Sequence, residues 1–195
     1  MKIRNKKTKN EYGYLSSEYK RQIIITLLMF VAPIIIFITG YVMYKTRYNI
    51  FAVLGVLALL PPGMNIVNVI MFIKAKKYAC DKETYDKTQK LVNGKAMEVK
   101  YDYYFTSYDM QYPVIALTVI DDCILGLTKQ DKFNHEKFEE HIKTMLSQNN
   151  IKVNVIKIFN KEDKFLERIK TYADKDMVPS DKDKNVLHIM GNLSL

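Results

Sequence analysis

The chain has 195 residues, of which 48% are hydrophobic and 26% charged, and it contains only two cysteines. These values exclude a disordered chain, a collagen-like chain and a disulfide scaffold. Thirty Lys and Arg residues oppose 21 Asp and Glu residues, for a formal net charge of +9. From residue 75 onward 20 basic and 19 acidic residues nearly balance, so the excess surrounds the apolar N-terminal region. We therefore expect a lipid bilayer with anionic headgroups as the partner of the basic residues, and no nucleic acid.

Two long apolar runs without a charged residue follow a basic N-terminal segment, residues 1–22. The first run covers residues 23–44, the connecting turn covers 45–49, and the second run covers 50–73. At 1.5 Å per residue, each run is longer than a hydrocarbon core of about 30 Å. The sequence predicts a two-helix transmembrane hairpin with an external turn.

The distribution of basic residues predicts the orientation of this hairpin. Seven basic residues precede the first run, the turn carries only Lys45 and Arg47, and seven more lie between Lys74 and Lys95. By the positive-inside rule, both termini are cytoplasmic. We expect a multi-pass protein of the cell membrane.

Helix-breaking and polar residues interrupt both runs: Pro33, Pro61, Pro62, Gly63, Asn65 and Asn68. The favoured interpretation is a kinked helix whose Asn side chains bond to freed carbonyls or to the neighbouring helix, with Gly40 and Gly55 allowing close packing. The alternative is a polar site at the membrane midplane, as in transporters. Because two helices alone offer too few walls for a pathway, that alternative needs an oligomer.

The region after the second run predicts a small cytoplasmic α+β domain. Residues 74–94 are expected to continue the second helix into the cytosol as a juxtamembrane helix that ends at Asn93-Gly94. In residues 95–173, the segments 97–106 and 112–120 are rich in β-formers and predict a hairpin. Asp121-Asp122 either turns the chain into a third strand, 123–128, or forms a bulge in one long strand.

The rest of the domain completes a β-β-(β)-α-β-α order. Asn134 is a predicted N-cap for a helix to Gln148, and residues 151–159 form the next strand. Asn160 and Asp163 are spaced like a capping box that opens a helix to residue 173. Residues 174–195 are expected to be a charged linker and C-terminal tail, with 186–190 able to form an edge strand. The apolar run 114–120 predicts a central strand covered on both faces by the two helices.

Candidate catalytic residues are few. Asp121 and Asp122 follow an apolar strand, where carboxylates can hold a divalent cation for phosphoryl or glycosyl transfer, although a polar turn is the stronger interpretation. His135 and His141 are six residues apart, which does not match the spacing of two zinc ligands on one helix face. No phosphate-binding or dinucleotide-binding motif occurs, so we expect no cofactor and no metal.

Several N-terminal segments carry a family resemblance: Gly13-Tyr14-Leu15, Lys20-Arg21, residues 37–41, Lys45-Thr46-Arg47 and residues 49–61. Together they resemble a family of small uncharacterised bacterial proteins with two transmembrane helices. The similarity covers roughly the first 75 residues. The family is sometimes labelled glycosyltransferase-like, and the resemblance implies that label without assigning a catalytic residue here.

These patterns predict an integral membrane protein that acts as a membrane-tethered interaction or regulatory module and is not an enzyme. It is expected to bind a protein partner or to self-associate. The first alternative is a membrane-bound, metal-dependent transferase or hydrolase that uses Asp121 and Asp122. The second is an oligomeric pore or a transporter accessory subunit.

Overall fold

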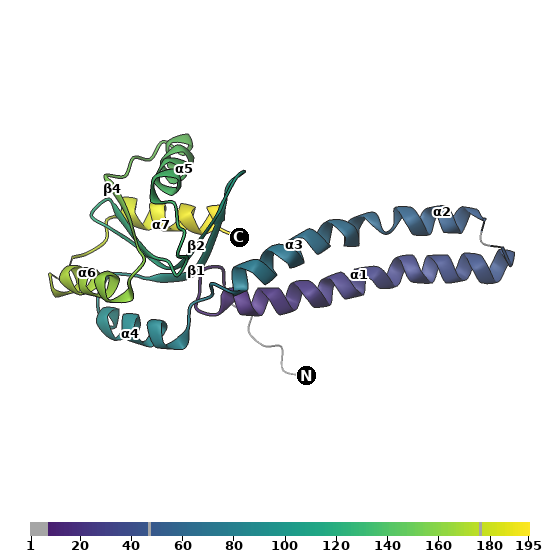
Figure 1. The fold of residues 1–195 in the computed structure, drawn as a ribbon, viewed down its shortest axis with the longest axis horizontal. Coiled ribbons are helices and arrows are strands. Elements are labelled where there is room, and N and C mark those ends of the chain that lie inside the picture. Colours follow the sequence, from purple (N-terminus) through teal and green to yellow (C-terminus); the bar gives the residue numbers. More distant parts are fainter. Residues whose placement is uncertain (1–7, 47, 176) are drawn as a thin grey trace. The chain divides into compact units, whose positions relative to one another are not determined.

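The computed structural model describes residues 8–46, 48–175 and 177–195, in two compact units (Figure 1). One unit is residues 15–77, a pair of long helical arms. The other is residues 78–195 together with the segment up to Tyr14. Arg47 and the first seven residues, which carry part of the predicted basic charge, lie outside the described residues.

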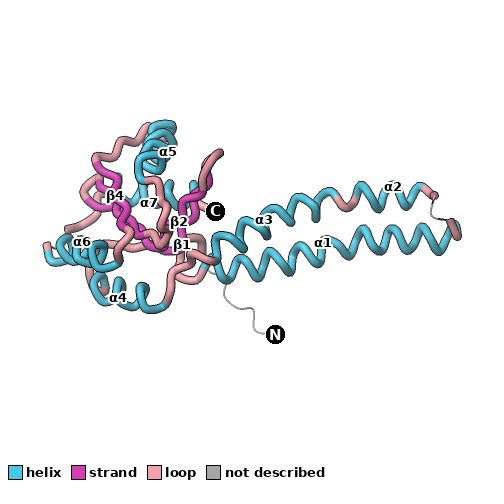
Figure 2. Tube along the Cα trace, in the orientation of Figure 1, coloured by secondary structure: helices cyan, strands magenta, loops and turns pink. Residues whose placement is uncertain are grey.

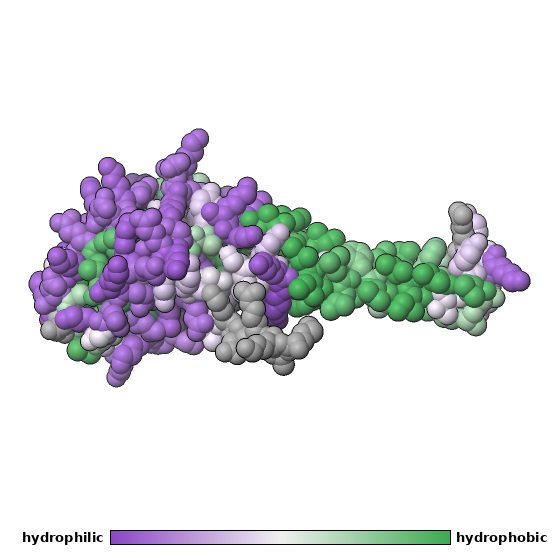
Figure 3. All heavy atoms as spheres, turned by 90° about the horizontal axis from the view of Figure 1, so that it is seen from below, coloured by the Kyte–Doolittle hydropathy of each residue, from purple (hydrophilic) through white to green (hydrophobic). Residues whose placement is uncertain are grey.

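The apolar hairpin contains three helices: α1 (Tyr14–Tyr44), α2 (Ile50–Leu57) and α3 (Leu60–Lys76). Both arms, Tyr14–Tyr44 and Ile50–Lys76, are long and apolar enough to cross a membrane. The helix α1 begins nine residues before the apolar run, because the polar segment from Tyr14 is also helical. In Figure 3 the surface of the hairpin is an almost continuous apolar band.

The second arm is broken at Ala58-Leu59, as the short loop in Figure 2 shows. The break lies just before Pro61 and Pro62, which occupy the first turn of α3. Proline is tolerated there because the first helical N–H groups have no partner within the helix. Gly63 follows in the same helix. The predicted interruption of the second arm therefore exists. However, α2 ends before the prolines, and the prolines themselves belong to the first turn of α3.

Close contact between the arms depends on one glycine. A Cβ atom on Gly40 would lie 2.3 Å from Cβ of Phe51 and 2.8 Å from Oδ1 of Asn49. The Asn49 side chain also caps α2 by accepting from the Ala52 N–H at 2.9 Å. Only glycine lets α1 approach the start of α2 this closely.

The second unit is an α/β domain with a mixed four-stranded sheet. Its elements are α4 (Lys82–Val92), β1 (Lys100–Thr106), β2 (Gln111–Ile120), β3 (Cys123–Leu127), α5 (His135–Gln148), β4 (Val155–Phe159), α6 (Glu162–Asp174) and α7 (Asp181–Leu193). The strands lie in the order β1-β2-β3-β4. The first three are antiparallel neighbours, and β4 is parallel to β3. The open choice at Asp121-Asp122 resolves as a turn into a third strand.

Helices cover both faces of this sheet (Figure 1). One core cluster packs α5 and α7 against the sheet, and the other packs α6 and the end of α4 against the opposite face. The central strand β2 is buried from Tyr112 to Ile120. The apolar run predicted that both faces of the sheet are covered. It predicted two covering helices, whereas in the described residues four helices, α4, α5, α6 and α7, cover the sheet.

Two predicted elements differ from the structure. Residues 74–94 are not one continuous helix: α3 ends at Lys76, and a separate helix, α4, starts at Lys82 and ends before Asn93-Gly94. The helix α6 begins at Glu162 after Lys161, which makes no side-chain cap, so the capping box on Asn160 is wrong.

The C-terminal region is a helix rather than a linker and an edge strand. Ser180 caps α7: its hydroxyl accepts from the Asp183 N–H at 3.1 Å, and the Asp183 carboxylate accepts from the Ser180 N–H at 2.9 Å. The apolar side chains of Val186, Leu187 and Met190 are buried in the core. Their spacing gives one helix face, which the surrounding charges obscured in the sequence.

Candidate functional site

Asp121 and Asp122 form the two-residue turn of the β2–β3 hairpin. Both have positive φ, 53° and 55°, which is the backbone of a type I′ turn and is favourable for Asp. The Asp122 N–H donates to Oδ1 of Asp183 at 3.0 Å, and the Lys182 ammonium lies 2.8 Å from Oδ1 of Asp122. The pair is thus joined to the first turn of α7. Within the described residues, no group of three His, Cys, Asp or Glu side chains is placed to hold a metal ion.

Asn65 of the second arm contacts the first arm, and Asn68 contacts Asn65. Nδ2 of Asn65 donates to Oγ1 of Thr26 at 2.6 Å, and Nδ2 of Asn68 reaches Oδ1 of Asn65 at 3.3 Å. Oγ1 of Thr26 in turn donates to the Gln22 carbonyl at 2.7 Å. The arrangement is a hydrogen-bond chain between helices, which is the favoured interpretation of these residues.

Within the α/β domain, two adjacent residues of β1 hold the segments that flank the hairpin in sequence. The Tyr101 N–H donates to the carbonyl of Asn10 at 2.9 Å. The carboxylate of Asp102 accepts from the N–H of Cys80 at 2.7 Å. Asp102 is fully buried and has φ of 59°, an uncommon conformation inside a strand. We name these residues, Asn10, Cys80, Tyr101 and Asp102, the junction.

Tyrosine rings support the junction beside α4. The rings of Tyr12 and Tyr85 stack with centroids 4.3 Å apart, and Tyr85 meets Tyr101 edge-on at 5.0 Å. Nε2 of Gln89 donates to the Tyr101 hydroxyl at 3.0 Å. A cleft of about 750 Å³ opens here, lined by residues 10–12, by Tyr85 and Gln89, and by the chain from Val92 to Tyr101. It exposes the chain that leads into β1, an edge strand of the sheet.

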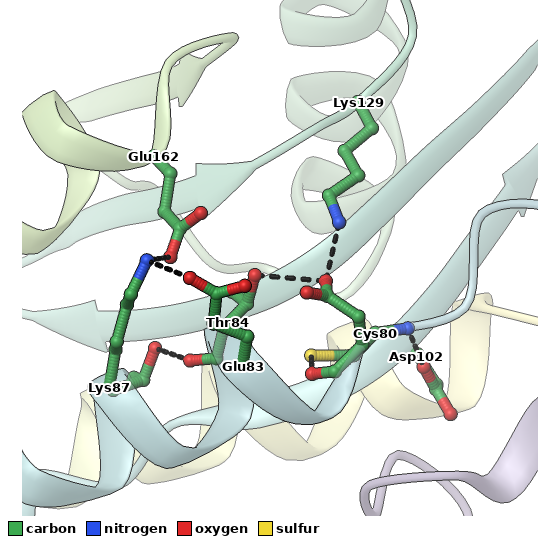
Figure 4. A network of polar contacts seen from close by, with 9 residues as sticks. Cys80, Glu83, Thr84, Lys87, Asp102, Lys129 and Glu162 are labelled. Carbon is green, nitrogen blue, oxygen red and sulfur yellow. Dashed lines mark hydrogen bonds and ion pairs between the residues drawn. The ribbon is translucent and has the colours of Figure 1, made fainter.

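An ionic network lies at the start of α4 (Figure 4). Lys129, which follows β3, donates to Oδ1 of Asp81, and Oγ1 of Thr84 donates to the same atom at 2.9 Å. Partial burial opposes ionisation of Asp81, but the bonds from Lys129 and Thr84 outweigh it and lower its pKa to about 2. Lys87 bridges Glu83 at 2.8 Å and Glu162 of α6 at 3.2 Å. The network joins α4 to α6 and to the end of β3.

The cysteines show no sign of reactivity. Burial, together with the nearby Asp102 and Asp81 carboxylates, raises the pKa of the Cys80 thiol to about 12. A reactive cysteine needs the opposite shift, because the thiolate is the nucleophile. Cys123 is also a free thiol, and burial raises its pKa.

The histidines considered as zinc ligands face different surroundings. His141 lies against Tyr112 with ring centroids 6.2 Å apart, and His135 lies against Phe133 at 5.1 Å. His188, on α7, has Nδ1 3.5 Å from Nδ2 of Asn192. Each ring therefore has a separate set of neighbours.

The sequence interpretation missed the junction. Asp102 has a visible signal, since it is a lone carboxylate within a strand of aromatic residues, Lys100–Thr106. Asn10 has no such signal, because it lies in the basic segment before the first helix, where no local pattern indicates a bond to β1.

No family model, no curated protein and no solved structure matches this chain.

Proposed function

We propose that the protein is a membrane-tethered interaction or regulatory module that crosses the cell membrane twice and has both termini in the cytoplasm. The apolar surface of the hairpin supports insertion, because side chains such as Leu27 and Val42 are about two-thirds exposed, at 64% and 66%. Such a surface is unfavourable in water and favourable in lipid.

The observation that carries the proposal is the junction. Asn10 precedes the first arm and Cys80 follows the second, and both are bonded to neighbouring residues of β1. Both ends of the hairpin therefore return to one folded domain, which requires them to lie on the same side of a bilayer. A domain held in this way acts at a raised local concentration near the membrane.

The cleft beside Tyr85 is the surface that we assign to a protein partner. Exposed main chain binds extended segments through hydrogen bonds, and tyrosine rings are enriched at interfaces. The cleft offers the segment that leads into β1 and the rings of Tyr12 and Tyr85, whereas the Tyr101 N–H of β1 itself is bonded to Asn10. Its tyrosines contact the junction. A bound segment there would change the environment of the residues that hold the hairpin.

Crosslinking of the tagged full-length protein in native membranes tests this function. We expect a partner that is captured by the wild type and lost in Tyr85→Ala. The matched control is Tyr108→Ala, since Tyr108 is fully exposed and lies outside the cleft. Equal capture by both variants, or capture of nothing, contradicts the assignment of the cleft. Self-crosslinks alone would instead identify a second copy as the partner.

Cysteine labelling from outside the cell tests the orientation. A reagent that cannot cross the bilayer should modify Thr46→Cys, in the connecting turn, and should not modify Tyr108→Cys, in the α/β domain. Native Cys80 is unsuitable as the cytoplasmic control, because it is buried. The opposite labelling pattern would overturn the topology.

A further inference from the structure

A second pocket, of about 390 Å³, lies between the segment 8–10, the β1 side of the sheet and one side of α7 from Lys184 to Asn192. All of its lining residues belong to the α/β unit. This volume is within the range of small-molecule sites. The pocket is separate from the turn at Asp121-Asp122. It adjoins the cleft beside Tyr85, with which it shares Asn10, Glu98 and Lys100.

The lining of this pocket is basic. It contains Lys9, Lys100, Lys184 and His188. Among the described residues that line the pocket, Glu98 is the single acidic one. Lys100 pairs with Glu98 at 2.6 Å, and the Lys9 ammonium lies 3.5 Å from the Asn192 carbonyl. The Lys184 ammonium lies 3.5 Å from Oδ1 of Asp181, in an exposed contact. The positive charge of the pocket therefore exceeds what its own acidic group neutralises.

One residue of this lining, Tyr103, has a buried hydroxyl without a partner among the described residues. Tyr103 is 1% exposed, and its hydroxyl has no hydrogen-bond partner within the described residues. A buried hydroxyl without a partner destabilises the fold, so such groups are rare in folded proteins. Burial, with a smaller effect of Glu98, raises the pKa of Tyr103, so the hydroxyl keeps its proton and can donate.

We propose that this pocket binds a phosphate monoester, with the Tyr103 hydroxyl as a hydrogen-bond donor and Lys184 and Lys9 as the cationic groups. A phosphate oxygen accepts strong charge-assisted hydrogen bonds from such donors. Binding would satisfy the Tyr103 hydroxyl and neutralise the surplus charge in one step. The phosphate can belong to a soluble metabolite or to a lipid headgroup, and the same chemistry recognises both.

The test uses the full-length protein in nanodiscs, with two probes. In the first arm, glycerol 3-phosphate is titrated into discs of phosphatidylcholine. In the second, the discs contain phosphatidic acid and no soluble phosphate is added. We expect saturable stabilisation against heat in at least one arm, and the arm that responds identifies the source of the phosphate.

Two variants locate the site. Tyr103→Phe should weaken binding about tenfold while the unliganded protein keeps or gains stability, because only an unpartnered hydroxyl is removed and the ring stacked on Phe105 remains. Lys184→Gln should weaken binding about three- to tenfold. The matched control is Lys182→Gln, which removes the same charge from the same helix outside the pocket.

Three results would overturn the proposal. They are the absence of saturable binding in both arms, unchanged affinity in Tyr103→Phe, and an equal loss of affinity in Lys182→Gln and Lys184→Gln. The inference does not depend on the proposed tether or on a protein partner. Its failure would leave the crosslinking and labelling outcomes unaffected.

Discussion

The two units of this chain place their apolar residues in opposite ways. In the hairpin, large apolar side chains such as Leu27 and Val42 are 64% and 66% exposed. In the α/β domain, Ile115 and Leu117 are fully buried in opposite core clusters. Figure 3 shows the same contrast at the surface, which is apolar on the hairpin and mostly hydrophilic on the domain.

This difference separates two sources of stability. The domain gains its stability by removing apolar side chains from water, which is worth about 25 cal/mol per Å² of buried apolar surface. In the hairpin, by contrast, few side chains are buried between the arms. Its arms meet by close approach at Gly40 and by the Asn65–Thr26 hydrogen bond, two kinds of contact that can pair helices without a hydrophobic driving force. The two units should therefore respond differently to the same kind of substitution.

The largest expected effect is at Phe138. This side chain is fully buried, and its ring contacts Phe105, Tyr112 and Phe133. Phe138→Ala should lower the free energy of unfolding of the domain by about 3–5 kcal/mol, as measured by denaturant titration of the full-length protein in detergent. Leu27→Ala, an exposed position in the hairpin, should change it by less than about 0.5 kcal/mol. Similar losses of unfolding free energy in Phe138→Ala and Leu27→Ala would show that the two units do not differ in how they are stabilised.

The next effect is at the junction, which links the two units along the chain. Asp102→Ala should cost about 2–4 kcal/mol, because it leaves the Cys80 N–H without its acceptor and puts alanine at positive φ. Asp102→Asn keeps an acceptor and tolerates this φ, so its cost should be about 1 kcal/mol. Thermal unfolding of both variants checks the order. Equal costs in the two variants would mean that loss of the negative charge, rather than loss of the hydrogen bond or an unfavourable φ, destabilises the protein.

A smaller effect is expected in the hairpin. The hydrogen bond between Asn65 and Thr26 should contribute about 0.6 kcal/mol to helix pairing, the average for such bonds in a membrane protein. A double-mutant cycle of Asn65→Leu and Thr26→Val, followed by unfolding in detergent, measures this coupling. Additive effects of the two substitutions would show that the contact carries no coupling energy.

The sequence predicted the elements whose patterns depend on local chemistry. Charge-free runs gave the two arms, Asn134 gave the start of α5, and Asn93-Gly94 gave the end of α4. Alternation and apolar content gave β2 as a central strand. In each case the residues that define the element are adjacent in sequence, so no tertiary information is needed.

The features that the sequence did not predict depend on contacts between distant residues. The helix α7 was missed because Asp181–Lys184 reads as solvated charge, although Asp183 bonds to Ser180 and to the turn at Asp122. The junction joins Asn10 to Tyr101, 91 positions along the chain, and Cys80 to Asp102, 22 positions along. Neither pairing is visible before the fold is known. The basic pocket likewise brings Lys9 near α7, which no local pattern indicates.

The smallest expected effect concerns the pH dependence of the network at α4. The pKa of Asp81 is lowered from an ordinary 3.8 to about 2, so the folded state favours the ionised carboxylate. Its contribution is complete above about pH 4 and is lost as the pH falls towards 2. Because Asp81 and Lys129 are partly exposed, solvent screening keeps this contribution below about 0.5 kcal/mol. Asp81→Asn should therefore lower stability slightly at pH 6 and reduce the loss of stability between pH 4 and 2. Tm values at these three pH values measure the change. Glu139→Gln, which breaks an exposed pair within α5, is the matched control for the loss of one ion pair. A slope that is the same in Asp81→Asn and wild type would show that Lys129 does not favour the charged form in the folded protein.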